Sequence, residues 1–155
     1  RIAESTAENV LEELRKADAV VGAVYLPGAK AARVITREMV RQMQPGSVII
    51  DVSIDQGGIA ETSRPTTHGD PVFVEEGVIH YCVANMPAAF PVTSTPALTN
   101  ATLPCVLELA NKGMAALKEN PALLRGLNIF KGMVTNKAIA ELFNLEYVDP
   151  LRVIS

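Results

Sequence analysis

Three short apolar runs, rich in β-branched residues, constrain the fold of this chain more than any other feature. They occupy residues 17–28, 47–54 and 78–87. The first closes on Pro-Gly, the second is followed by Asp-Gln-Gly-Gly, and the third closes on Asn-Met-Pro. An uninterrupted apolar run of this length is typical of a strand buried on both faces, as the strands of parallel sheets are. The sequence therefore predicts three buried strands in one sheet.

Two amphipathic stretches lie beside these runs and read as helices. Residues 6–16 place their apolar side chains on one stripe, and Ser5 or Thr6 can cap this helix. Residues 36–43 give a second helical pattern, which begins at Thr36 and ends before a Pro-Gly pair. Strand–helix–strand order is typical of βαβ units, whose strands are parallel. We therefore predict an α/β fold with a parallel sheet.

The strand pattern stops near residue 92, and helices are predicted beyond it. Residues 57–77 read as a loop-rich stretch before the third run, and residues 87–100 are rich in proline and threonine. The helices predicted after that are residues 97–120 (with Pro104 inside or kinking the helix), 121–125, and 136–143 with Thr135 as cap. The expected organisation is two parts, residues 1–92 and 93–155.

Composition limits the class of partner. The chain has 155 residues and a formal net charge of −3, which argues against a nucleic-acid or anionic membrane surface. Its apolar runs fall well short of the roughly 20 residues that cross a bilayer. Cys82 and Cys105 lack metal-ligand spacing, so no metal is expected, and we interpret both as reduced core thiols of a cytosolic protein. The first residue is Arg1 rather than Met, which indicates a processed product or a fragment.

Polar and small residues follow each predicted strand. In an open parallel sheet, ligands bind beyond the carboxyl ends of the strands. Pro27-Gly28 follows the first run, Asp55 with two glycines the second, and Asn85 the third. Each has a structural alternative: a turn, an exit from the sheet, or a local hydrogen bond to the backbone. A carboxylate that ends so apolar a strand needs a partner, so Asp55 is the best candidate to face a ligand.

This sheet edge suits a planar cofactor with a polar rim, because Val24, Leu26 and Met86 can contact a ring and Asn85 can hydrogen-bond it. The dinucleotide motif G-x-G-x-x-G is absent from the printed sequence. Nucleotide binding therefore does not follow from these residues alone.

Several motifs together resemble the bacterial L-alanine dehydrogenases. They are LPGAK (26–30), DQGG (55–58), SRPTT (63–67), VANMP (83–87) and NPALLRGLNIFKG (120–132), in the order and spacing of that family. The resemblance covers essentially the whole chain. It implies a C-terminal portion of the enzyme: residues 1–92 would be the second half of a Rossmann-like NAD domain, and residues 93–155 helices that return to the substrate domain.

The resemblance also implies an activity and partners. Members of the family carry out the reversible, NAD-dependent oxidative deamination of L-alanine to pyruvate and ammonium, as cytosolic homohexamers. The rest of the same polypeptide would supply the catalytic histidine, the ligands of the substrate carboxylate and the phosphate-binding loop.

Residue by residue, the resemblance makes Asp55 the catalytic aspartate. The cofactor-binding positions that it implies are Ser5, Val24, Tyr25, Val52, Ser53, Ile54, Asp55, Ala84, Asn85, Met86 and Pro87. Ser5 serves equally well as a helix cap. His68 and His80 match no family base and are interpreted as surface or structural residues, and Lys30 and Arg64 as solvated cations.

Two other functions stay open. One is a nucleotide-binding part related to proton-translocating transhydrogenase, where the segment matching DQGG tends to lack the aspartate. The other is a non-catalytic piece that acts in binding or oligomerisation. Asp55 favours the amino-acid dehydrogenase.

Overall fold

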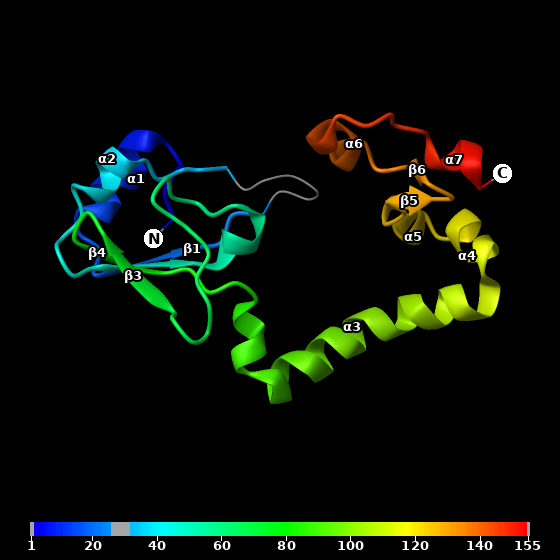
Figure 1. The fold of residues 1–155 in the computed structure, drawn as a ribbon, viewed down its shortest axis with the longest axis horizontal. Helices are drawn as coiled ribbons and strands as arrows, with labels where there is room; N and C mark the ends of the chain where they lie inside the picture. The colour runs from blue at the N-terminus through cyan, green and yellow to red at the C-terminus, as the bar shows by residue number, and fades with distance from the viewer. Residues whose placement is uncertain (1, 26–31, 155) are drawn as a thin grey trace. The chain divides into compact units, whose positions relative to one another are not determined.

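The computed structural model describes residues 2–25 and 32–154. The chain divides into two compact units, Arg1–Ala89 (unit 1) and Phe90–Ser155 (unit 2), drawn in Figure 1. This division falls three residues before the end of the first part expected from the sequence. The assignment of the two parts to an NAD domain and a substrate domain stays a prediction.

Unit 1 contains a four-stranded sheet in the order β1-β2-β4-β3. The three predicted strands are present and parallel: β1 (Ala19–Gly22) pairs with β2 (Val48–Asp51), and β2 pairs with β4 (Val78–Tyr81). The fourth, β3 (Val72–Glu75), runs antiparallel to β4. The predicted α/β fold is confirmed, as a mixed sheet in which parallel pairs dominate.

The loop predicted over residues 57–77 was wrong in its last part, because β3 lies there. Glu76 and Gly77 have φ values of 51° and 78° and form the two-residue connection between β3 and β4. Two successive positive φ values are typical of the tight hairpin turn that matches the twist of antiparallel strands. Val72 and Val74 are exposed while Phe73 stacks on His80, so β3 alternates as an edge strand does.

The second and third predicted strands are shorter than expected. β4 ends at Tyr81, and a short 3₁₀ helix, η2 (Met86–Ala89), begins within the residues predicted as the end of the third strand. β2 ends at Asp51, and the next residues form a short 3₁₀ helix, η1 (Val52–Gln56). The interpretation of residues 52–54 as strand was therefore wrong. Their side chains do not alternate between faces: Val52 is exposed, and Ser53 and Ile54 are both buried.

The expectation that the first strand is buried on both faces was also wrong. Val21 is 65% exposed, whereas Val20 contacts the core. Helices α1 (Ala7–Leu14) and α2 (Arg37–Val40) pack on the other face of the sheet, where Leu14 and Val40 meet the strands. The fully buried members of this core are Val40, Ile49, Ala60 and Val78.

Threonine caps both helices of unit 1. The Oγ1 of Thr6 accepts a hydrogen bond from the amide of Asn9 (3.2 Å), so Thr6 rather than Ser5 is the cap of α1. The Oγ1 of Thr36 accepts in the same way from the amide of Met39 (3.2 Å). Caps of this kind stabilise a helix by about 1 kcal/mol.

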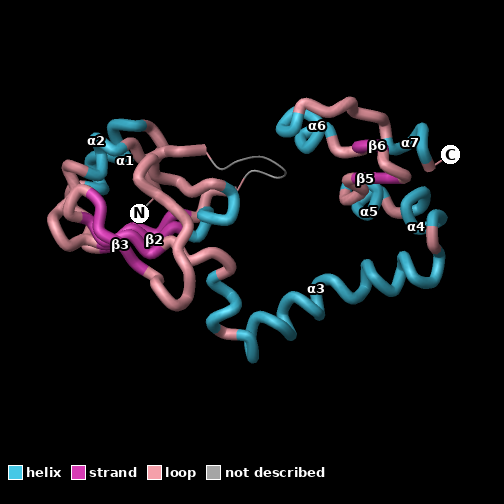
Figure 2. Tube along the Cα trace, viewed as in Figure 1, coloured by secondary structure: helices cyan, strands magenta, loops and turns pink. Residues whose placement is uncertain are grey.

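Unit 2 is mainly helical, as Figure 2 shows. Its elements are α3 (Pro91–Lys112), α4 (Met114–Glu119), α5 (Pro121–Arg125), β5 (Ile129–Phe130), β6 (Met133–Val134), α6 (Lys137–Phe143) and α7 (Pro150–Val153). Helices are present where they were predicted, but the single helix predicted over residues 97–120 is broken at Gly113 (φ 55°) into α3 and α4. The hairpin β5–β6 and the helix α7 were not predicted. Within residues 2–25 and 32–154, no helix is long and apolar enough to cross a membrane.

Two details of unit 2 differ from the prediction. Helix α3 begins six residues earlier, at Pro91, because proline fits the first turn of a helix, and both Pro96 and Pro104 lie inside it. The cap of α6 is Asn136, whose side chain accepts from two amides. The hydroxyl of Thr135 donates instead to the carbonyl of Leu127 (2.7 Å).

Candidate functional site

The segment that carries Asp55 is a tight turn directly beyond the carboxyl end of β2. We call residues 52–58 the Asp55 turn. It consists of η1 followed by Gly57 and Gly58, whose φ values are 103° and 78°. The amide of Gly57 donates to the carbonyl of Ile54 (3.0 Å), and that of Gly58 to the carbonyl of Ser53 (3.1 Å). Because glycine adopts positive φ without a steric penalty, two glycines let the chain reverse here.

Asp55 is exposed at this turn and faces the end of the next strand. The amide of Asn85 donates to the carboxylate of Asp55, at 3.3 Å from Oδ1 and 3.2 Å from Oδ2. Asn85 has a φ of 53°, a left-handed conformation that few residues other than glycine adopt. The structure therefore brings together Asp55 and Asn85, which are 30 residues apart in the sequence.

A second hydrogen bond joins the ends of β1 and β2. The hydroxyl of Ser53 donates to the carbonyl of Val24 (2.8 Å). With the Asp55–Asn85 contact, the segments that follow all three parallel strands are linked at one edge of the sheet. This is the edge at which open parallel sheets bind their ligands.

The predicted cofactor positions differ in exposure. The side chains of Tyr25 and Val52 are 72% and 48% exposed, but that of Ile54 is 3% exposed and points into the core. The other exposed positions are Ser5, Asp55, Ala84, Asn85 and Pro87, and Met86 is half-buried. The residues Leu26, Pro27, Gly28 and Lys30, which the sequence also singled out, lie outside the described residues.

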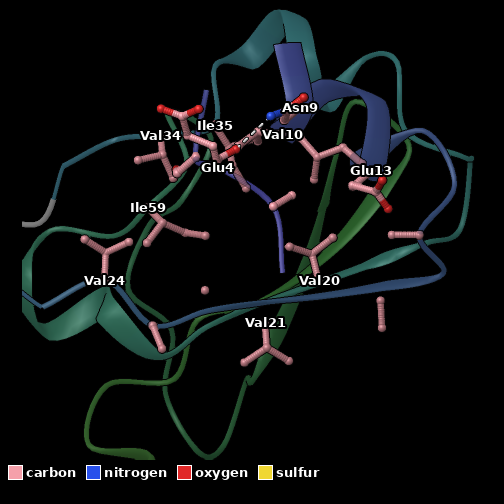
Figure 3. Close-up of a pocket in the computed structure, with 17 residues that line it drawn as sticks. Glu4, Asn9, Val10, Glu13, Val20, Val21, Val24, Val34, Ile35 and Ile59 are labelled. Carbon is pink, nitrogen blue, oxygen red and sulfur yellow. Dashed lines mark hydrogen bonds between the residues drawn. The ribbon is translucent and has the colours of Figure 1, made fainter. Parts of the chain in front are cut away.

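A separate hollow of about 570 Å³ lies between α1 and β1, and we call it the α1 hollow (Figure 3). Ser5 and Val24 line it, whereas Asp55 and Asn85 do not. Its wall is mainly apolar. Figure 3 shows Val20 pointing up from β1, on the side where Ile35 lies, and Val21 pointing down on the opposite side. Val24 thus belongs to both places, with its side chain in the hollow and its carbonyl on Ser53.

His68 contacts Asn85, the residue whose amide donates to the Asp55 carboxylate. Its Nε2 lies 3.3 Å from the carbonyl oxygen of Asn85, which accepts a hydrogen bond when that nitrogen carries the proton. His68 comes from the loop before β3, and no motif or spacing in the sequence indicated this contact.

His80 has a structural role inside unit 1. It is fully buried, its Nε2 lies 2.8 Å from the hydroxyl of Thr62, and its ring stacks on Phe73 at 4.9 Å. The guanidinium of Arg64 lies 3.9 Å from the centre of the Phe73 ring on which His80 stacks. Burial lowers the pKa of His80, because the imidazolium would lose its hydration.

The two cysteines differ from each other. Cys82 is buried, and burial raises the pKa of its thiol, as expected of an inert core cysteine. Cys105 lies exposed on α3, so the expectation of a core thiol was wrong there. Among the described residues, no three His, Cys, Asp or Glu side chains gather as a metal site would require.

Comparison with known proteins identifies the family. The family model described as the alanine dehydrogenase/PNT C-terminal domain matches residues 1–137. The chain belongs to this family. The resemblance noted in the sequence is thereby confirmed.

Relatives and a solved structure agree with this assignment. The chain is 54% identical to an alanine dehydrogenase of Halomonas elongata over 151 residues, covering 97% of the chain and 41% of that protein. It is 57% identical to alanine dehydrogenase 2 of Staphylococcus aureus over 141 residues, covering 90% and 38%. A solved L-alanine dehydrogenase matches 90% of the chain and 38% of its own, with 42% identity and a TM-score of 0.76.

The chain therefore spans about two fifths of the length of these alanine dehydrogenases. Its match to the family's C-terminal domain includes the whole of unit 1, and with it the Asp55 turn and Asn85.

Proposed function

We propose that this chain forms part of an NAD-dependent alanine dehydrogenase, which converts L-alanine to pyruvate and ammonium reversibly. The observation that carries the proposal is the contact of the exposed Asp55 carboxylate with Asn85, at the carboxyl edge of a parallel sheet, in a chain of the alanine dehydrogenase family. An exposed carboxylate at such an edge is a candidate for acid–base chemistry.

The residues at this edge fit a dinucleotide. Beside Gly57 there is open space, since a Cβ there would meet no atom of the described residues within 4 Å, so a flat group can approach the backbone. The cofactor residues that we propose are Ser5, Val24, Tyr25, Val52, Ser53, Ile54, Asp55, Ala84, Asn85, Met86 and Pro87. Because Ile54 is buried, its contribution would come from the backbone rather than from the side chain.

NAD, when bound, accepts a hydride from the α-carbon of the amino acid. The role of this chain is to hold polar groups beside the reacting carbon. We assign Asp55 to proton transfer in the iminium and carbinolamine steps, because its carboxylate is exposed and accepts a hydrogen bond from the amide of Asn85. The histidine base and the ligands of the substrate carboxylate would come from the rest of the same polypeptide.

We also propose the oligomeric state, the cellular location and the domain organisation of the enzyme. We expect a homohexamer in the cytoplasm, with the Rossmann-like NAD domain including residues 1–92 and the substrate domain including residues 93–155. The support for these points is the identity of 54–57% with alanine dehydrogenases.

A spectrophotometric assay tests the proposal. The full-length protein is mixed with NAD and L-alanine, and NADH is followed by its absorbance. We expect NADH formation that depends on alanine, and pyruvate with ammonium should reverse it. A protein that instead passes hydride only between NADH and a second nucleotide would be a transhydrogenase relative. Binding of NAD without either reaction would indicate a non-catalytic module.

A further inference from the structure

A second carboxylate, Asp51, lies completely buried at the end of β2. Its side chain is 0% exposed. Its Oδ2 accepts hydrogen bonds from the amide of Ile59 (2.8 Å) and from the hydroxyl of Ser63 (2.6 Å). Its Oδ1 has no hydrogen-bond partner among the described residues. Burying a carboxylate is costly unless hydrogen bonds compensate it. These two hydrogen bonds offset part of that cost, and the burial of Asp51 needs a structural explanation.

The two bonds close the Asp55 turn. Asp51 stands immediately before the turn and Ile59 immediately after it, so the hydrogen bond between them joins the points where the chain leaves the sheet and returns. The return point is itself fixed to the core, because Ile59 is buried and its carbonyl accepts from the amide of Ile35 (3.0 Å). Ser63, which lies in a third segment, donates a hydrogen bond to the same oxygen of Asp51.

Packing around Asp51 leaves little freedom at this junction. A Cβ at Gly58 would lie 2.8 Å from Oδ2 of Asp51 and 2.8 Å from Cβ of Ser63. On the neighbouring strand, a Cβ at Gly22 would overlap the side chain of Ile59. The backbone of the turn therefore passes directly against the carboxylate.

We propose that Asp51 is a positioning residue for Asp55. It does not touch the reacting groups. Through Ile59 and Ser63 it sets the path of the turn, and the path of the turn sets where the Asp55 carboxylate lies. Among the described residues, the Asp55 carboxylate accepts a hydrogen bond from the amide of Asn85 alone, at 3.2–3.3 Å, so the position of this carboxylate depends on the turn. The inference rests on the proposed function, in which Asp55 acts on the substrate.

Three substitutions in the full-length protein separate positioning from general stability. Asp51→Ala removes both hydrogen bonds, and Ser63→Ala removes one. Asp51→Asn keeps the shape and an oxygen that can accept both bonds, and its amide group would occupy the place of the unpartnered Oδ1. The matched control is Thr62→Val, which removes a buried hydrogen bond to His80 in the same segment without touching the Asp55 turn.

The readout is the split between kcat and KM, measured on folded protein. Displacement of a catalytic group by about 1 Å can cost about 100-fold in rate. We expect kcat to fall about 100-fold in Asp51→Ala and by about 3- to 10-fold in Ser63→Ala, with the KM for NAD within about 3-fold of wild type. Asp51→Asn should keep kcat within about 3-fold, and Thr62→Val should keep it despite a lower melting temperature.

Several results would overturn the inference. Wild-type kcat in both Ser63→Ala and Asp51→Ala, with lower melting temperatures, would make Asp51 a purely structural residue. An Asp51→Asn variant as impaired as Asp51→Ala would show that the charge, not the hydrogen bonds, matters.

Amide hydrogen exchange of residues 52–59 is a readout that needs neither activity nor the Asp51→Ala variant. It should speed up in Ser63→Ala and stay unchanged in Thr62→Val, and equal exchange in the two variants would contradict the inference. If wild type forms no NADH from alanine, the proposed function fails, and the exchange result still decides whether Asp51 holds the turn.

Discussion

Replacing Gly58 with alanine probes the point where the Asp55 turn meets the buried Asp51. Gly58 has a φ of 78° and is buried, and a Cβ there would lie 2.8 Å from both Oδ2 of Asp51 and Cβ of Ser63. Gly57 gives a matched control: its φ is 103°, but a Cβ there would meet nothing within 4 Å in the described part of the chain. Both alanines suffer the strain of a positive φ, and only the one at position 58 also overlaps its neighbours.

The expected magnitudes follow from these two terms. The left-handed conformation costs a residue with a Cβ roughly 1–2 kcal/mol. Overpacking in a well-filled interior adds about 1–3 kcal/mol. We expect Gly57→Ala to lower the free energy of unfolding by about 1–2 kcal/mol, and Gly58→Ala to lower it by about 2–5 kcal/mol.

Urea unfolding of the two variants, followed by circular dichroism, measures the difference. The midpoint of Gly58→Ala should lie clearly below that of Gly57→Ala, with similar slopes, because a change in midpoint at constant slope reports stability. Equal midpoints would refute the reasoning, since they would mean that the space beside Gly58 is not filled by Asp51 and Ser63.

Three further outcomes follow from the structure. The pKa of His80 is lowered in the folded chain from its ordinary value of about 6.5, so the unfolded chain takes up this proton at a higher pH than the folded chain does. The free energy of unfolding should therefore fall as the pH drops from 7 to 5, and His80→Gln should flatten that fall in urea titrations. Ser53→Ala, which loses the bond to the Val24 carbonyl, should lower the free energy of unfolding by about 1 kcal/mol, and an unchanged urea midpoint would contradict this. Residues 1–155 expressed alone should form no NADH from alanine and NAD, because this stretch lacks the G-x-G-x-x-G phosphate loop; measurable turnover by the purified chain would show that the loop is not needed.

The sequence predicted the central part of unit 1 because its signals are local. β-branched apolar runs identified β1, β2 and β4, and Thr6 and Thr36 identified the starts of two helices. The parallel order of these strands then placed Asp55 and Asn85 at one edge, where the structure has them in contact.

The features that were missed depend on contacts between distant residues or on conflicting local signals. Strand β3 follows a Pro- and Gly-rich stretch, and its Glu-Gly turn is a weaker hairpin signal than Asn-Gly. The early start of α3 was hidden by prolines, which usually interrupt helices but fit their first turn. The Asp51–Ser63 bond could not be predicted, because it needs the path of the Asp55 turn in three dimensions.

The most direct test of the account compares two aspartates in the full-length protein. Asp55→Ala removes the carboxylate that faces Asn85, and Asp18→Ala removes an exposed aspartate next to the amino end of β1. Alanine-dependent NADH formation and NAD affinity are measured for both. Loss of an acid–base group costs about 100- to 10,000-fold in rate, so we predict a kcat reduced to that extent in Asp55→Ala, NAD affinity within about 3-fold, and wild-type kcat in Asp18→Ala. Wild-type turnover in Asp55→Ala would contradict the account.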